Sequence, residues 1–218
     1  MSTTPTAAFI VRRRAGARPH GLRGGRACVA VMSVMSVLSA LACGTAQAAP
    51  RALVPAESRI DFVVKEMGVP VQGSFQRFEA TIAIDAQDPA RSSAELRIAV
   101  GSLSTGTPEA DAIAVDKDWL DKDHAPWAKF SARSFRDLGG GHFEARGQLE
   151  LRNRPRELVL RFASTEQPGG RTLITSDFVI RRSEFGIGAG EWNEAGVVAE
   201  EIPVKVRLML AAPGQAAR

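Results

Sequence analysis

The chain has 218 residues, with 28 Lys and Arg against 24 Asp and Glu and a formal charge of +4. The basic excess lies in the first 48 residues, which hold six arginines and no acidic residue; without them 22 basic residues remain against 24 acidic ones, a charge of about −2. Both cysteines, Cys28 and Cys43, lie in the same segment. The rest of the chain therefore lacks the basic excess typical of nucleic-acid binding, and it has no thiol for catalysis or disulfide formation.

Residues 1–48 have the three parts of a secretory signal. An arginine-rich start is followed by an apolar run from Cys28 to Cys43, and Ala46-Gln47-Ala48 offers small residues where a signal peptidase reads. The run is shorter than the roughly 20 residues of a membrane-spanning helix. We expect cleavage near Ala48 and an exported mature protein. The alternative is a lipoprotein acylated at Cys43, but Ala40 stands where a large aliphatic residue is usual.

After the leader, apolar and polar residues alternate for most of the chain, which predicts strands with one buried and one exposed face. In chain order the predicted strands lie at 59–64, 78–85, 95–100, 129–136, 143–152, 157–162, 174–181 and 202–208. Turn sequences separate several of them, namely Gly139-Gly140-Gly141, Asn153-Arg154-Pro155 and Gln167-Pro168-Gly169-Gly170. Short connections impose antiparallel pairing, so we expect about eight antiparallel strands in a sandwich or an up-and-down barrel.

One segment breaks the alternation. Thr107-Pro108-Glu109 is typical of a helix N-terminus with proline at the first helical position. A weak helical stripe of apolar residues continues to Leu120. This pattern predicts one short helix within residues 107–120, followed by a loop over residues 121–127.

Several residues on the predicted buried faces are small: Ala80, Ala132, Ala145, Gly147 and Ser176. An eight-stranded barrel can fill its interior with side chains or can hold one small ligand there. Small inward residues leave volume for either. At this point the pattern leaves both a packed core and a ligand cavity open.

Ordered motifs between Ser58 and Leu210 resemble the YceI-like family of periplasmic polyisoprenoid-binding and lipid-binding proteins. The first are the opening strand at residues 58–64 and the G-x-x-x-x-G-x-F-x-x-F stretch at residues 68–78. The next are Asp118-Trp119-Leu120-Asp121 with Ala125–Phe130, and Gly147–Arg152. Arg182-Ser183-Glu184-Phe185-Gly186-Ile187 resembles the most specific motif of the family, R-[ST]-[DE]-[FW]-G-[IV]. Each motif is short, but their preserved order makes the resemblance strong.

The resemblance implies an all-β, eight-stranded, antiparallel, lipocalin-like barrel with one short helix, formed by residues 49–218 with a core at 58–210. It implies a long apolar interior that holds an isoprenoid or fatty lipid without a cofactor, in the periplasm. The expected role is transport or storage of that lipid, with transient membrane contact and with a homodimer left open. The turn at Arg152-Asn153-Arg154-Pro155 departs from the family pattern.

The candidate site follows from strand parity, aromatic content and the resemblance. The predicted cavity lining is Phe62, Phe75, Phe78, Ile82, Trp119, Trp127, Phe130, Phe178, Ile180 and Phe185. The two tryptophans flank the predicted loop, where they form either the mouth of the barrel or the contact that docks the helix. His124 and Arg182 are candidates to meet a polar headgroup. The alternative for the apolar residues is ordinary core.

Catalytic and metal-binding motifs are scarce. A calcium loop counted from Asp116 would need glycine and glutamate where Asp121 and Trp127 stand, so we expect no metal site. After the leader only His124 and His142 remain as histidines, and the chain has no nucleophile elbow or phosphate loop. We therefore expect a binding protein and not an enzyme. The alternatives are a periplasmic enzyme that uses the same cavity and an accessory partner of a membrane redox protein.

Overall fold

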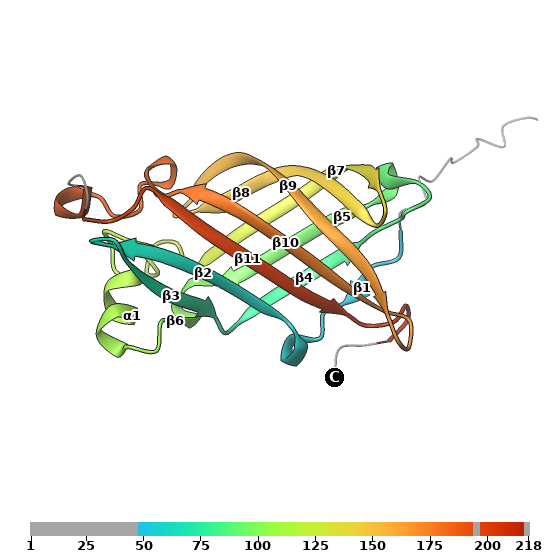
Figure 1. Ribbon diagram of the computed structural model, residues 1–218, viewed down its shortest axis with the longest axis horizontal. Helices are drawn as coiled ribbons and strands as arrows, with labels where there is room; N and C mark the ends of the chain where they lie inside the picture. Colours follow the sequence, from blue (N-terminus) through green and yellow to red (C-terminus); the bar gives the residue numbers. More distant parts are fainter. Residues whose placement is uncertain (1–47, 194–196, 216–218) are drawn as a thin grey trace, which may run out of the picture. The chain divides into compact units, whose positions relative to one another are not determined.

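The computed structural model describes residues 48–193 and 197–215 (Figure 1). The predicted leader lies outside these residues, apart from Ala48. No helix in the described ranges is long and apolar enough to cross a membrane.

The described chain is dominated by strands, in agreement with the alternating sequence pattern (Figure 1). The strands are β1 (Arg51–Ala52), β2 (Arg59–Glu66), β3 (Val69–Phe75), β4 (Phe78–Ala83), β5 (Ser93–Ala99), β6 (Leu103–Ser104), β7 (Trp127–Gly139), β8 (His142–Leu151), β9 (Arg154–Gln167), β10 (Arg171–Arg181) and β11 (Glu201–Leu210). The α-helix is α1 (Pro108–Ala114), and the 3₁₀ turns are η1 (Pro55–Glu57), η2 (Pro89–Arg91), η3 (Val100–Ser102), η4 (Arg182–Phe185) and η5 (Gly190–Asn193).

All strand pairs are antiparallel and belong to one sheet, in the order β1-β4-β5-β7-β8-β9-β10-β11-β2-β3-β6. Two contacts close this sheet on itself. Leu53, just after β1, bridges to Leu210 at the end of β11. At the other edge β6 pairs with β3 and continues from β5 through η3. The predicted antiparallel barrel with one short helix is confirmed, and closure leaves few unpaired strand edges.

The strand count is eleven in the described residues, not about eight. Two of the additions, β1 and β6, have two residues each, too few to show alternation. The third is β3, whose Pro70 and Gly73 interrupt the pattern. Gly73 is needed there because a Cβ at this position would lie 2.3 Å from the ring of Phe62 on the paired strand. The alternation did not predict β3, because packing against Phe62, and not strand propensity, selects glycine at position 73.

Strand β7 contains a bulge that alternation alone does not predict. The register with β8 shifts between Ala132 and Ser134, which leaves Arg133 as the extra residue. Phe130 and Ala132 face the interior before the bulge, and Phe135 faces it afterwards. A single inserted residue thus reverses the parity of the strand and turns a second phenylalanine inward.

The turns match the glycine-rich sequences only in part. The β7–β8 hairpin uses Gly140 and Gly141 at positive φ, as expected. The β8–β9 hairpin instead turns at Arg152 and Asn153, with φ of 50° and 56°, and Pro155 already belongs to β9. Two consecutive left-handed residues are the requirement of a tight hairpin turn. The turn therefore lies one to two residues earlier than the sequence predicts.

The helix is shorter than predicted and ends at Ala114. Thr107 occupies the N-cap position and Pro108 the first turn, as expected. The start of the helix is also tied to the preceding loop, because the Asp111 carboxylate accepts hydrogen bonds from the backbone and hydroxyl of Thr105. These hydrogen bonds lower the pKa of Asp111.

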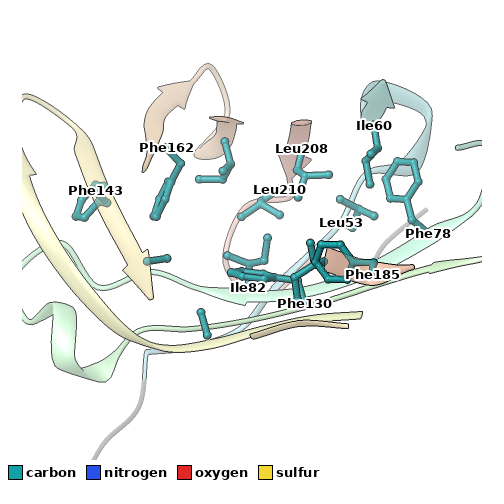
Figure 2. Packing of buried hydrophobic residues seen from close by; sticks show 14 of the residues in the cluster. Leu53, Ile60, Phe78, Ile82, Phe130, Phe143, Phe162, Phe185, Leu208 and Leu210 are labelled. Atoms are coloured by element: carbon teal, nitrogen blue, oxygen red, sulfur yellow. The ribbon is translucent and has the colours of Figure 1, made fainter. Parts of the chain in front are cut away.

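The buried core gathers side chains from the inner face of the sheet (Figure 2). Phe143 and Phe162 stack with ring centroids 5.5 Å apart, and Phe135 meets Phe162 edge to face. Leu53 and Leu210, which close the sheet, are buried in the same cluster. Packing therefore concentrates near the strand ends that close the barrel.

Candidate ligand-binding cavity

The interior of the barrel is hollow, because inward side chains of several strands do not meet across it. Leu96, Leu160, Phe178 and Val206 belong to inward rows, yet all four keep partial exposure. They border a first compartment with about 840 Å³ of space free of protein atoms, part of it open to solvent. Concave hollows with a mostly apolar lining are typical of small-molecule sites.

A second compartment adjoins the first and has about 780 Å³ of space free of protein atoms, part of it open to solvent. Both are bordered by a shared set of residues: Ile60, Ile98, Leu149, Phe178 and Val204. The second compartment extends toward α1 and reaches Ala114, Trp119 and Leu120. The two compartments therefore adjoin inside the barrel, and both are almost wholly apolar.

A third hollow of about 550 Å³ continues from the second. They share Phe62, Val64, Ala114 and Trp119, and the third hollow ends among Glu66, Thr105, Ile113 and Trp192. Here α1 lies beside the tip of the β2–β3 hairpin, at the left of Figure 1. We call this third hollow the mouth.

Trp119 stands at the neck between the second compartment and the mouth, where it borders both. It meets Trp192 edge to face, with ring centroids 5.6 Å apart. Its indole Nε1 is buried and has no hydrogen-bond acceptor among the residues described. The two rings bring α1 and the segment after η4 together over the cavity end.

Seven of the ten predicted lining residues border the cavity. Ile82 and Phe130 border the first compartment, Phe178 borders both, and Phe62, Phe75, Trp119 and Ile180 border the second. Four of them come from strands whose alternation assigned their face in advance: Phe62, Ile82, Phe178 and Ile180. The structure thus brings together residues up to 118 positions apart, from Phe62 to Ile180.

The other three predicted lining residues lie elsewhere. Trp127 is on the outer face of β7, where the Arg97 guanidinium lies 4.6 Å from its ring centroid. Phe185 is buried in the core beside η4, and Phe78 is buried and borders a surface groove near η1. Trp127 is the first residue of β7, and its neighbour Ala128 faces inward. The alternation of the strand therefore turns Trp127 outward. The assignment of Trp127 to the mouth is therefore corrected.

Arg182 does not face the cavity, so its assignment to a headgroup is also corrected. Its side chain is 3% exposed. The guanidinium donates to the backbone carbonyls of Ile187, Gly188, Trp192 and Val198, at 2.9–3.3 Å. A buried charge of this kind must be hydrogen-bonded. The four hydrogen bonds hold the segment that carries Trp192 against Arg182.

His124 lies on the surface, with 80% of its side chain exposed, and it borders none of the hollows described above. Its Nδ1 is 2.8 Å from the carboxylate of Asp121. This hydrogen bond raises the pKa of His124 and lowers that of Asp121. The pair is a surface contact in the loop after α1 and meets no ligand in the cavity.

The hydrogen bond between His124 and Asp121 predicts a raised titration midpoint for His124. We expect the NMR titration midpoint of His124 to lie above 6.5 and to fall toward that value in Asp121→Asn. Because the folded-state pKa is raised, the contribution of His124 to stability is present below its unfolded pKa and is lost as the pH rises through the folded value. An unchanged midpoint in Asp121→Asn would show that Asp121 does not set the shift.

Much of the lining and the acidic residue at the mouth were not among the predicted site residues. Most of the missed apolar residues lie on faces that the alternation marks as buried, so parity was a sufficient signal for them; they include Ile60, Ile84, Leu96, Ile98, Leu149, Leu158, Leu160, Ile174, Val204, Val206 and Leu208. Phe135 was missed because the bulge in β7 turns it inward against the predicted parity. Glu66 is exposed at the mouth and follows Ile60, Phe62 and Val64 in the inward row of β2, beyond the end of the predicted strand at residue 64.

The cavity offers little chemistry besides apolar contact. Ser176 borders the first compartment, but its hydroxyl donates to the Arg161 carbonyl at 2.7 Å. Within residues 48–193 and 197–215, no three His, Cys, Asp or Glu residues gather as metal ligands would. These features define the class: an antiparallel barrel with adjoining apolar compartments in its interior.

Comparison with known proteins gives the family. A model described as the YceI-like domain matches residues 52–210, and the chain belongs to this family. A UPF0312 protein of Vibrio cholerae is 26% identical over 138 residues, which cover 61% of this chain and 73% of that protein.

Solved structures share the fold. BcnA of Burkholderia cenocepacia superposes with a TM-score of 0.69 at 29% identity, over 72% of this chain and 98% of BcnA. A polyisoprenoid-binding domain from Saccharophagus degradans, implicated in plant cell wall breakdown, gives 0.59 at 17% identity, over 76% and 99%. A Campylobacter jejuni YCEI protein gives 0.55 at 16%, over 64% and 83%.

Proposed function

We propose that this barrel binds a long-chain isoprenoid or fatty lipid in its cavity, without covalent attachment. The observation that carries the proposal is the pair of adjoining apolar compartments, which extend from Ile82 and Phe130 past Phe178 to Trp119. Burial of each methylene group contributes about 0.8 kcal/mol, so about ten buried carbons contribute about 8 kcal/mol before the cost of immobilising the chain. Such a chain needs no polar contact to bind.

Similar proteins support this proposal. The Saccharophagus degradans neighbour is a polyisoprenoid-binding domain, and a mutant of the Campylobacter jejuni neighbour was solved with a monobromobimane guest. The first of these names an isoprenoid ligand, the class that we propose for this chain. The cavity lining also favours binding over catalysis, since the Ser176 hydroxyl is already bonded to a carbonyl and the Lys129 ammonium to Glu150.

The role that we propose is passive carriage or storage of the lipid in the periplasm. The basis is the signal-like sequence of residues 1–48, with Ala46-Gln47-Ala48 as the cleavage site. Expression of the full chain should yield a periplasmic protein whose intact mass is that of a polypeptide beginning at Ala49. A mass that retains the leader, or one that includes acyl groups on Cys43, would refute cleavage at this site.

Filling the cavity tests binding directly. Val206 faces Ser176 across the β10–β11 pair and borders the first compartment. Val206→Trp should weaken binding of geranylgeraniol, a C20 isoprenoid alcohol, at least about tenfold by occupying its space, while the free energy of unfolding changes by less than about 1 kcal/mol. Calorimetric titration and urea denaturation measure the two quantities.

The matched control is the neighbouring outward residue, Lys205→Trp, which should leave the affinity unchanged. If the interior were a packed core, Val206→Trp would instead destabilise the fold by about 1–3 kcal/mol. Such destabilisation, with unchanged affinity for the alcohol, would refute the cavity as the binding site.

A further inference from the structure

The inward row of β2 ends in a carboxylate. Ile60, Phe62 and Val64 border the cavity, and Glu66, two residues further, borders the mouth. The position of Glu66 is fixed by backbone contacts, because it bridges to Val198 and pairs with Val69 of β3. The Glu66 side chain is exposed and borders the mouth, so a negative charge lies beside it.

The described residues that border the mouth include no cation that could balance an anionic ligand. Among the described residues that border the two compartments and the mouth, Lys129 is the one cation, and its Nζ is 3.0 Å from the Glu150 carboxylate. The Arg182 guanidinium is already bonded to backbone carbonyls. His124, the other expected headgroup contact, pairs with Asp121 on the surface.

An anionic head placed at the mouth would meet the Glu66 carboxylate, and one drawn into the cavity would lose its hydration without a partner. Both situations are unfavourable, because like charges repel and unpaired charges are costly to bury. An uncharged head meets neither penalty. We infer that the barrel selects lipids with an uncharged head group and that Glu66 discriminates against anionic ones, such as carboxylates and phosphates. This inference rests on the proposed lipid binding.

The test compares two ligands that carry the same hydrocarbon chain. Geranylgeraniol and geranylgeranoic acid share a C20 isoprenoid chain and differ in a hydroxyl against an ionised carboxylate at pH 8. The wild-type protein should bind the alcohol at least about tenfold more tightly than the acid in calorimetric titration. Glu66→Gln should reduce this ratio several-fold by strengthening acid binding, with alcohol binding unchanged, and Glu66→Lys should bring the acid to equal or greater affinity.

Glu157→Gln is the matched control, because Glu157 is exposed on β9 and borders none of the three hollows. It should leave the ratio unchanged. Equal binding of both ligands by the wild type, or an unaltered ratio in Glu66→Gln, would overturn the inference and leave lipid binding standing. If the folded protein binds neither ligand, the proposed function itself fails and the inference falls with it.

Discussion

Phe178→Asp should abolish lipid binding, with affinity for geranylgeraniol reduced by at least about 100-fold. Phe178 borders both compartments, so its side chain lies midway along the path that a long chain would occupy. A carboxylate at this point would either be stripped of water by the ligand or keep water in the cavity, and both outcomes oppose burial of an apolar chain. Calorimetric titration measures the loss.

The adjacent residue supplies the control. Val179 points to the other face of β10 and is 49% exposed. Val179→Asp introduces the same charge one residue away, outside the barrel, and should bind the alcohol as the wild type does. Circular dichroism of both variants checks that each is folded. Similar affinities in the two variants would place the ligand somewhere other than the cavity.

Arg182→Met should destabilise the protein by about 3–5 kcal/mol, because it removes a buried guanidinium that donates to four backbone carbonyls. The substitution retains much of the side-chain volume but leaves four backbone carbonyls without their shared donor. Buried carbonyls without a donor are costly, and their segment carries Trp192 toward Trp119 at the neck. Urea denaturation measures the change.

Arg181→Met is the matched control. Arg181 is exposed and its guanidinium lies 3.9 Å from Glu201, an ion pair at the surface. Such pairs contribute little, so this variant should lose less than about 1 kcal/mol. A comparably small loss in Arg182→Met would show that the guanidinium does not hold the segment in place.

Strand parity carried most of the prediction of the fold. Phe62 and Phe178 belong to rows of alternating apolar residues, and the structure turns both inward as parity requires. Parity failed at Arg133, where a bulge adds one residue and brings Phe135 inward. The bulge has no local sequence signal, because it depends on the register between β7 and β8.

The polar part of the site was predicted less well. Arg182 was expected at a headgroup, yet it is buried against backbone carbonyls of a segment that follows it in the chain. Trp127 was expected at the mouth, but it begins β7 on the outer face. Such contacts depend on how loops fold over the barrel end, which residue type does not determine. Glu66 could have been found by extending the inward row of β2 by one member.

These differences change the expected ligand. The sequence suggested that His124 and Arg182 meet a polar headgroup at the mouth. The structure instead has Glu66 there and engages both cations elsewhere. The apolar cavity therefore keeps its proposed role, while the charge at its opening favours a neutral lipid.

The proposed lipid should occupy the cavity in the living cell. Native mass spectrometry of the protein purified from its own host measures this occupancy. We expect one barrel with the added mass of one long-chain lipid, which denaturing conditions release. A mass of the bare polypeptide alone, together with no uptake of added geranylgeraniol by the same sample, would contradict the account.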